Sequence, residues 1–428
     1  MKLQHLPKPE AQSSVCDGVW ARAALVAIVI WPTFAGFLVL QFDFSPGALQ
    51  ILGPLSVALL LYVAGALADR GAPMRVMAKW QLALTMAIAL AFVVSTARSA
   101  LQPSDALIHG LIDATLAAGA IGAFLLLRAG GEVMIRRMLL SIVLAGLVYI
   151  IFFVLNFDTM VSMAEGQNAT VSFFPYVNVR RLTNALAPAV AIAIVLWTVF
   201  GPRDRWLGYF CGLAATILVT FLMWSGGRAP VGATLLALLG LSLWAKGELR
   251  RRLLGRVAVA YTAGTGLSVL LPIPETGAFG FWNRLFSTEI NASPAGFSSN
   301  RLGIWESTLQ MIPDRLWFGH GYWQWQSHRD EFALHGSAHN FPLQILFDFG
   351  LVGGGAAIIL AFGTWLRHIR MLDDRRPLHI AAVAGLSVMM IQCFLDGIFS
   401  GRPSLLVVLL AFAMASAALH AYHAGAKT

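Results

Sequence analysis

The sequence predicts an all-α integral membrane protein, with about twelve transmembrane helices and one large helical loop on the outer side of the membrane. Hydrophobic residues make up 58% of the 428 residues, charged residues make up only 12%, and the mean hydropathy is +0.72. This composition excludes a soluble globular protein. Apolar runs long enough to cross a bilayer recur along the chain, and one long polar stretch interrupts them after residue 272.

The expected transmembrane helices follow from these runs in order. A polar stretch, residues 1–18, precedes the first run without a small-residue cleavage site, so we expect a retained signal-anchor. Asp113 and Asp396 are the main acidic residues inside the runs. The runs cover residues 19–40, 48–68, 79–97, 105–127, 137–156, 182–200, 206–225, 229–245, 254–272, 341–366, 378–398 and 403–423.

Basic residues orient the expected bundle. When the N-terminus is placed in the cytoplasm, 21 of the 30 Lys and Arg residues fall in inner segments, which obeys the positive-inside rule. Residues 1–272 then hold nine helices, residues 273–340 form a loop on the outer side, and residues 341–428 hold three more helices, all as one functional unit. Anionic lipids of the inner leaflet explain the net charge of +9, so no nucleic-acid partner is indicated.

The outer loop contains a predicted amphipathic helix over residues 301–312. Apolar residues recur there at spacings of three and four, Ser299 or Asn300 can cap the helix, and Pro313 ends it. We expect this helix to lie on the bilayer or over the bundle. Its expected apolar face consists of Leu302, Trp305, Leu309 and Ile312.

His339 stands where the outer loop runs into a new transmembrane helix. His339-Asn340 is followed after nine residues by Gly350-Leu-Val-Gly353. A histidine side chain titrates near neutral pH, and small residues below it allow close helix packing. A base held just above a bilayer suits chemistry on a lipid-borne substrate.

This pattern, His-Asn-x9-Gly-x2-Gly, resembles the signature of the O-antigen ligase and polymerase superfamily of membrane glycosyltransferases. The resemblance covers Met223 to Gly355, although two glycines separate the Ser and Arg of the family's Ser-Arg element here. It implies a GT-C-like fold with a periplasmic catalytic loop in the bacterial inner membrane, and no metal or other cofactor. Three further stretches carry it: Trp224-Ser225-Gly-Gly-Arg228, Arg301-x3-Trp305 and Phe318-Gly-His-Gly321.

The resemblance implies transfer of O-antigen polysaccharide from undecaprenyl pyrophosphate to the lipid A-core oligosaccharide. His339 would remove the proton of the attacking hydroxyl. All nine outer basic residues are arginines, which form bidentate charge-assisted bonds with phosphate. Arg228 and Arg301 would therefore hold the departing pyrophosphate, and the further candidates are Arg180, Arg181 and Arg402.

Other interpretations of these residues stay open. O-antigen polymerisation and protein O-oligosaccharyl transfer share the motif, and a transporter or flippase of lipid-linked sugars also needs outer arginines. Zinc is considered because His335-x3-His339 has helical ligand spacing, with His320 and His328 nearby, but Gly336 disfavours a helix there. Glu306 and Asp348 are reserve acid–base candidates. Three arginines are interpreted as solvated loop charges: Arg284, Arg315 and Arg329.

Overall fold

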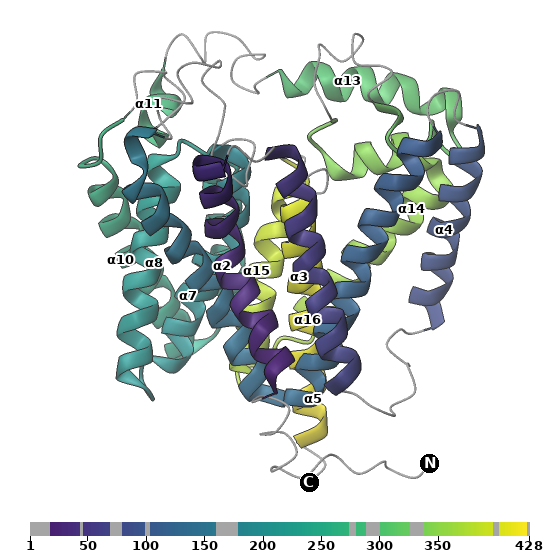
Figure 1. Cartoon of the computed structure of the whole chain (residues 1–428). Coiled ribbons are helices and arrows are strands. Elements are labelled where there is room, and N and C mark those ends of the chain that lie inside the picture. The colour runs from purple at the N-terminus through teal and green to yellow at the C-terminus, as the bar shows by residue number, and fades with distance from the viewer. Residues whose placement is uncertain are drawn as a thin grey trace.

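Long apolar helices run side by side in the computed structural model, and shorter helices lie across one end of them (Figure 1). The structure describes residues 18–42, 46–68, 79–98, 103–159, 179–273, 280–287, 300–325, 337–396 and 402–425, and every regular element in these ranges is a helix. The elements are α2 (Val19–Phe42), α3 (Pro46–Ala68), α4 (Lys79–Arg98), α5 (Pro103–Leu155), α7 (Val179–Phe200), α8 (Arg205–Trp224), α9 (Arg228–Trp244), α10 (Gly247–Ser268), α11 (Phe281–Phe286), α13 (Arg301–Met311), the 3-10 turn η1 (Ile312–Arg315), α14 (Phe341–Arg370), α15 (Pro377–Gln392) and α16 (Arg402–Gly425).

Each of the twelve expected runs falls within or largely overlaps one of these helices. The runs at 105–127 and 137–156 share α5, which breaks at Gly131, where φ is 59°. In the described part of the chain, seven helices are long and apolar enough to cross a membrane, and three shorter apolar helices accompany them. These helices indicate a multi-pass membrane protein, while twelve crossings and a GT-C-like fold remain predictions.

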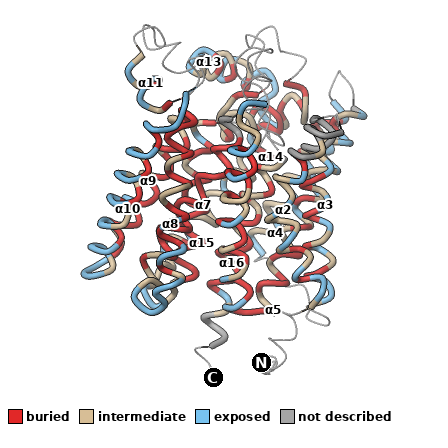
Figure 2. The backbone as a smooth tube through the Cα atoms, turned by 60° about the vertical axis from the view of Figure 1, so that its left-hand side comes forward, coloured by how far each residue is buried: buried red, intermediate tan, exposed pale blue. Residues whose placement is uncertain are grey.

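Helix α7 lies at the centre of the bundle together with α15 (Figure 2), and α4 lies at its edge (Figure 1). Nearly all of Leu182–Phe200 in α7 is buried, whereas the buried residues of α4 are Ala91, Ser95 and Thr96. Small side chains allow α15 to approach α7 closely, because a Cβ on Gly385 would lie 2.9 Å from the Ile192 side chain. The central position of α7 therefore buries the polar residues near its first turn, Thr183 and Asn184.

A second close contact joins α3 to α5. A Cβ on Gly119 would lie 2.5 Å from the Cβ of Ala58, and one on Gly122 would lie 2.3 Å from the Cα of Tyr62. A Cβ on Gly65 would lie 2.1 Å from the carbonyl oxygen of Gly122. The two backbones therefore meet directly, which is the packing that small residues permit between membrane helices.

The predicted loop helix is present as α13, which lies across the end of the bundle (Figure 1). Its buried side chains are Ile304 and Thr308, and Ile304 packs in a small core with Trp325 and Phe347. The predicted apolar face is wrong in part, because Leu302 and Leu309 are exposed. The helix packs with the face that meets the loop before α14, and the spacing of apolar residues alone did not identify that face.

Candidate functional site

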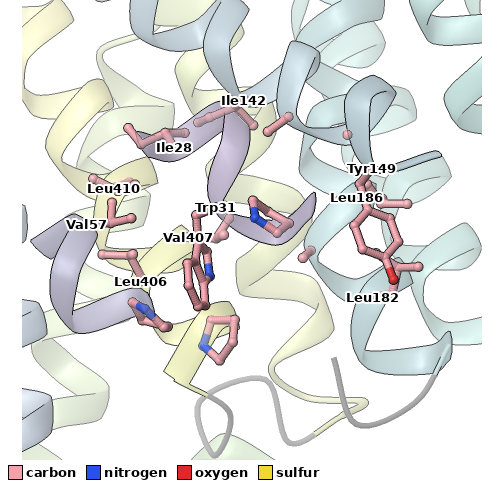
Figure 3. Close-up of a pocket in the computed structure, with 16 residues that line it drawn as sticks. Ile28, Trp31, Val57, Ile142, Tyr149, Leu182, Leu186, Leu406, Val407 and Leu410 are labelled. Carbon is pink, nitrogen blue, oxygen red and sulfur yellow. The ribbon is translucent and has the colours of Figure 1, made fainter. Parts of the chain in front are cut away.

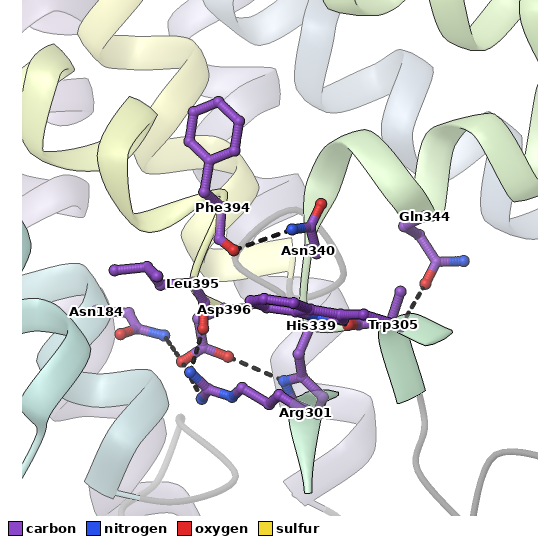
Figure 4. Close-up of polar contacts among 10 residues, drawn as sticks. Asn184, Arg301, Trp305, His339, Asn340, Gln344, Phe394, Leu395 and Asp396 are labelled. Carbon is purple, nitrogen blue, oxygen red and sulfur yellow. Dashed lines mark hydrogen bonds and ion pairs between the residues drawn. The ribbon is translucent and has the colours of Figure 1, made fainter. Parts of the chain in front are cut away.

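Asp396 forms the polar centre of the end of the bundle that α13 covers (Figure 4). Its Oδ1 lies 3.0 Å from Nδ1 of His339, and its Oδ2 accepts a 2.8 Å hydrogen bond from the side-chain amide of Asn184. The guanidinium of Arg301 lies 3.6 Å from the same Oδ2. One nearly buried carboxylate thus joins residues from α7, α13, the start of α14 and the turn after α15.

The turn after α15 is locked to the start of α14. The backbone N–H of Phe341 donates to the carbonyl of Cys393 at 2.7 Å, and the side-chain amide of Asn340 donates to the carbonyl of Phe394 at 3.0 Å. Asn340 also caps α14, because its side-chain oxygen accepts from the N–H of Leu343 at 3.1 Å. The Asn of the His-Asn pair therefore fixes both the helix start and the neighbouring turn that carries Asp396.

His339 itself has a left-handed backbone, with φ of 50°. A non-glycine residue in this region costs free energy and persists only where its surroundings hold it. Trp305 of α13 contributes to this by donating to the carbonyl of Ala338 at 3.0 Å. The imidazole is thereby directed at Asp396 and keeps 28% of its side chain exposed.

Arg301 begins α13 and contacts two groups of the turn after α15. One guanidinium nitrogen donates to the carbonyl of Leu395, and another faces Asp396. Burial alone would raise the pKa of the Asp396 carboxyl. The hydrogen bond from His339, the charge of Arg301 and the amide of Asn184 outweigh burial and hold this pKa well below its usual value.

Arg228 lies at the first position of α9, beyond a sharp turn at the end of α8. Gly226 in this turn has φ of 75°, and a Cβ on Gly227 would lie 2.9 Å from the hydroxyl of Thr183 in α7. Arg228 is close enough to Arg301 for their like charges to interact. The structure therefore brings His339, Arg301 and Arg228 to one region at the end of the bundle that α13 covers.

Arg284 contradicts its interpretation as a solvated loop charge. It is only 5% exposed, and its guanidinium donates to the carbonyl of Gly226 at 3.0 Å. The turn before Arg228 is held further by two bonds of Trp224, whose indole donates to Pro272 at 2.8 Å and whose carbonyl accepts from Gly280 at 2.7 Å. Arg284 thus supports the turn that positions Arg228.

Gly350 does more than allow close helix packing. Its φ of 62° breaks α14, and the released backbone groups bond to the loop after η1. The N–H groups of Leu351 and Val352 donate to the carbonyls of Leu316 and Trp317 at 2.8 and 3.1 Å. The carbonyls of residues 347 and 348 accept from the N–H groups of residues 320 and 321 at 2.8 and 3.0 Å. The Phe318-Gly-His-Gly321 stretch is therefore docked on the break in α14.

The other predicted site residues are not brought into this network by the described contacts. Arg180 and Arg181 lie in α7 and Arg402 begins α16, but their side chains are outside the described residues. His320 stacks on Phe347, with its Nε2 3.0 Å from the carbonyl oxygen of Met311. His328, His335 and Arg329 also lie outside the described ranges.

Two of the cavities among the described helices differ in size and in lining. The larger, of about 740 Å³, has His339 and Asn340 in its wall. The smaller, of about 90 Å³, lies between α2, α3, α5, α7 and α16 and is lined almost wholly by apolar side chains (Figure 3). The polar side-chain groups that line the smaller cavity belong to Trp31 and Tyr149, and its lining residues include no acid–base pair.

Sequence reasoning did not assign Asp396 and Asn184 to the site. Asp396 was placed inside the expected run 378–398, but α15 ends at Gln392, so the carboxylate lies in the turn beyond the helix. The feature of the sequence that could have identified Asp396 is an acidic residue near the outer end of an apolar run. Asn184 stands next to the predicted arginines in the sequence and gave no separate signal, because an amide near a helix start is common.

The helices and the site define a multi-pass membrane protein with an imidazole–carboxylate pair at one end of its bundle. Residues 213–358 match the family model for O-antigen ligase, which confirms the resemblance seen in the sequence. The match includes Arg228, Arg301 and His339 and supports a membrane glycosyltransferase of the ligase or polymerase type acting on lipid-linked glycans. No curated protein matches the chain.

Proposed function

We propose that this protein transfers O-antigen polysaccharide from undecaprenyl pyrophosphate to the lipid A-core oligosaccharide at the periplasmic face of the bacterial inner membrane. The contact between His339 and Asp396 at 3.0 Å is the observation that carries the proposal. It supplies an oriented base inside the segment that matches the O-antigen ligase family. A carboxylate on one imidazole nitrogen is the arrangement that general-base catalysis by histidine uses.

His339 removes the proton of the acceptor hydroxyl in this proposal. Because Asp396 is ionised, Nδ1 of His339 carries its hydrogen and donates to the carboxylate. Nε2 is then the nitrogen that takes the proton. The hydroxyl oxygen forms a bond to the anomeric carbon, and the bond from that carbon to the pyrophosphate oxygen breaks, with inversion of the anomeric centre.

Arg228 and Arg301 hold the pyrophosphate that leaves with the bonding electron pair. The like charges of Arg228 and Arg301 repel each other, so an anion bound between them relieves this repulsion. Guanidinium groups stabilise the developing charge without a divalent ion, so the proposed reaction is metal-independent. Arg180, Arg181 and Arg402 remain further candidates for this role.

Two neighbouring functions share much of this chemistry. O-antigen polymerase and protein O-oligosaccharyltransferase differ only in the acceptor, and the motif does not separate them from a ligase. A transporter or flippase of lipid-linked sugars needs outer arginines but no proton acceptor. The His339–Asp396 pair therefore favours an enzyme.

The deciding experiment is an assay of the purified protein with undecaprenyl-pyrophosphate glycan and lipid A-core. We expect a joined product that forms equally well in EDTA. His339→Ala should abolish it, and Arg228→Lys should lower it although the charge is kept, because lysine lacks the bidentate geometry. Gln310→Ala, an exposed change on α13, is the control and should retain activity. Full activity of His339→Ala would remove His339 as the base.

A further inference from the structure

The larger cavity has His339 in its wall, and Asp396 is not among its described lining residues. It is bounded by α4, the first turns of α5, the start of α14 and the segment 322–325, with a volume of about 740 Å³. This size is typical of a binding pocket for a molecule of several hundred daltons. His339 is one of the lining residues, so a molecule in the cavity lies next to the residue proposed as the base.

The polar groups of this cavity are carboxyl, amide and hydroxyl groups. The hydroxyl of Tyr322 donates to the carboxyl of Asp113. The side-chain amide of Gln344 donates to Asp348 at 3.1 Å, and its oxygen accepts from the N–H of Ala338 at 2.8 Å. The described lining contains no Lys or Arg side chain. Hydroxyl groups of a sugar can exchange hydrogen bonds with this set.

The cavity wall also carries aromatic and aliphatic surface. Trp323 lines it in a left-handed backbone conformation, with φ of 66°, and its ring lies 3.9 Å from that of His109. Phe92, Ile88 and Leu111 line the part formed by α4 and α5. Aromatic faces stack on sugar rings, and the apolar part suits an aliphatic chain.

The polar groups near Asp396 differ in kind from those that line the cavity. Arg301 faces Asp396, and Arg228 is close enough to Arg301 for their charges to interact, whereas neither arginine lines the cavity and the carboxyl-bearing Asp113 and Asp348 do. A diphosphate is stabilised by guanidinium groups and is disfavoured in a poorly hydrated space beside carboxyl groups. The pyrophosphate of the donor therefore belongs with the arginines, and the cavity is left for the other reactant.

We propose that this cavity binds the acceptor, as an amphipathic glycolipid whose reacting sugar is free of phosphate. The inference rests on the proposed function and adds to it the place and the chemical class of the acceptor. The hydroxyl of that sugar meets His339 from the cavity side, while the pyrophosphate meets the arginines on the other side. The base thus stands between the two reactants.

A pair of matched variants on α4 tests the location. Ala89 lines the cavity and Ala83 is exposed on the same helix outside the described lining. We expect Ala89→Trp to raise the KM for lipid A-core by about tenfold or more while the KM for the undecaprenyl-pyrophosphate glycan stays within about twofold. Ala83→Trp should change neither. A rise in the donor KM alone would overturn the proposal and leave the proposed function standing.

A binding measurement separates failure of this inference from failure of the proposed function. A photo-crosslinking amino acid at position 89, in protein that also carries His339→Ala, is exposed to lipid A-core or to the donor alone. Crosslinking to lipid A-core with a phosphate-free terminal sugar supports the inference even if no transfer is measured. Crosslinking to the donor instead, to neither lipid, or equally well to lipid A-core with a phosphate on that sugar would overturn it.

Discussion

Asp396 contacts three side chains through its two carboxylate oxygens. Its Oδ1 faces His339, and its Oδ2 faces Asn184 and Arg301. Because these partners hold its pKa below the usual value, the contribution of this carboxylate to stability is present above a pH of about 4, the ordinary value of an aspartate. It is lost only as the pH falls through the lowered pKa. Asp396 is therefore an anion throughout the range in which a histidine base works.

Asp396→Asn should lower kcat by about two to four orders of magnitude, because the amide no longer fixes the tautomer of His339 or stabilises its protonated form. The KM for lipid A-core should change little, since the side-chain volume is kept. Steady-state kinetics of joined-product formation measures both constants. Asp373→Asn, in the loop after α14, is the control and should behave like the native protein. Unchanged kcat in Asp396→Asn would show that His339 needs no carboxylate.

The break in helix α14 at Gly350 provides the docking site for the loop after η1. The left-handed backbone at Gly350 exposes hydrogen-bonding groups that a continuous helix would use internally, and the loop after η1 takes them. A Cβ on Gly350 would lie 2.5 Å from the backbone nitrogen of Phe318. One on Gly319 would lie 2.4 Å from the carbonyl of Asp348. Both glycines are required by the same junction.

Gly350→Ala should therefore destabilise the protein, by at least about 1–3 kcal/mol from the backbone conformation alone. The steric clash with the loop adds to this cost and should displace the segment that leads to His339. Thermal unfolding in detergent, followed together with transfer activity, measures the effect. Gly355→Ala on the same helix is the matched control, because nothing lies within 4 Å of its Cβ position. Equal melting temperatures for the two variants would contradict this account of the junction.

At the scale of the whole molecule, the positions of the helices were predictable and the way they turn was not. Hydropathy locates α2 to α5 and α7 to α9 closely, because burial in lipid or in the bundle requires long apolar runs. Gly350 breaks α14 inside a single apolar run, whereas Gly131 breaks α5 in the polar stretch between the expected runs 105–127 and 137–156. A backbone break inside an apolar run depends on what packs against it, so hydropathy does not predict the break at Gly350.

The candidate site was predictable as far as the resemblance reached. His339, Arg228 and Arg301 lie in one region, as the resemblance implies. Asp396 was missed because its role depends on where α15 ends, and helix ends are the least predictable feature of an apolar run. Arg284 was misread because a loop arginine is usually solvated, whereas here a tertiary contact to Gly226 buries it.

The orientation of the bundle still rests on its basic residues. Lys246, Arg370 and Arg376 line a common depression between the loop after α9 and the loop after α14. Helix α13 and the His339 site lie at the end of the bundle that α13 covers (Figure 1). Basic residues near short loops favour the cytoplasmic side. We therefore expect α13 to face the periplasm.

Cysteine labelling checks this orientation in a variant from which the native cysteines have been removed. Gln310→Cys, at an exposed position of α13, should react with a membrane-impermeant maleimide in intact spheroplasts. Arg251→Cys, at an exposed position near the start of α10, should react only after the membrane is permeabilised. The reverse pattern would place His339 at the cytoplasmic surface. The proposed ligation requires the glycan, the acceptor and the base to meet on the periplasmic side, so that result would exclude it even if the geometry of the His339–Asp396 pair were correct.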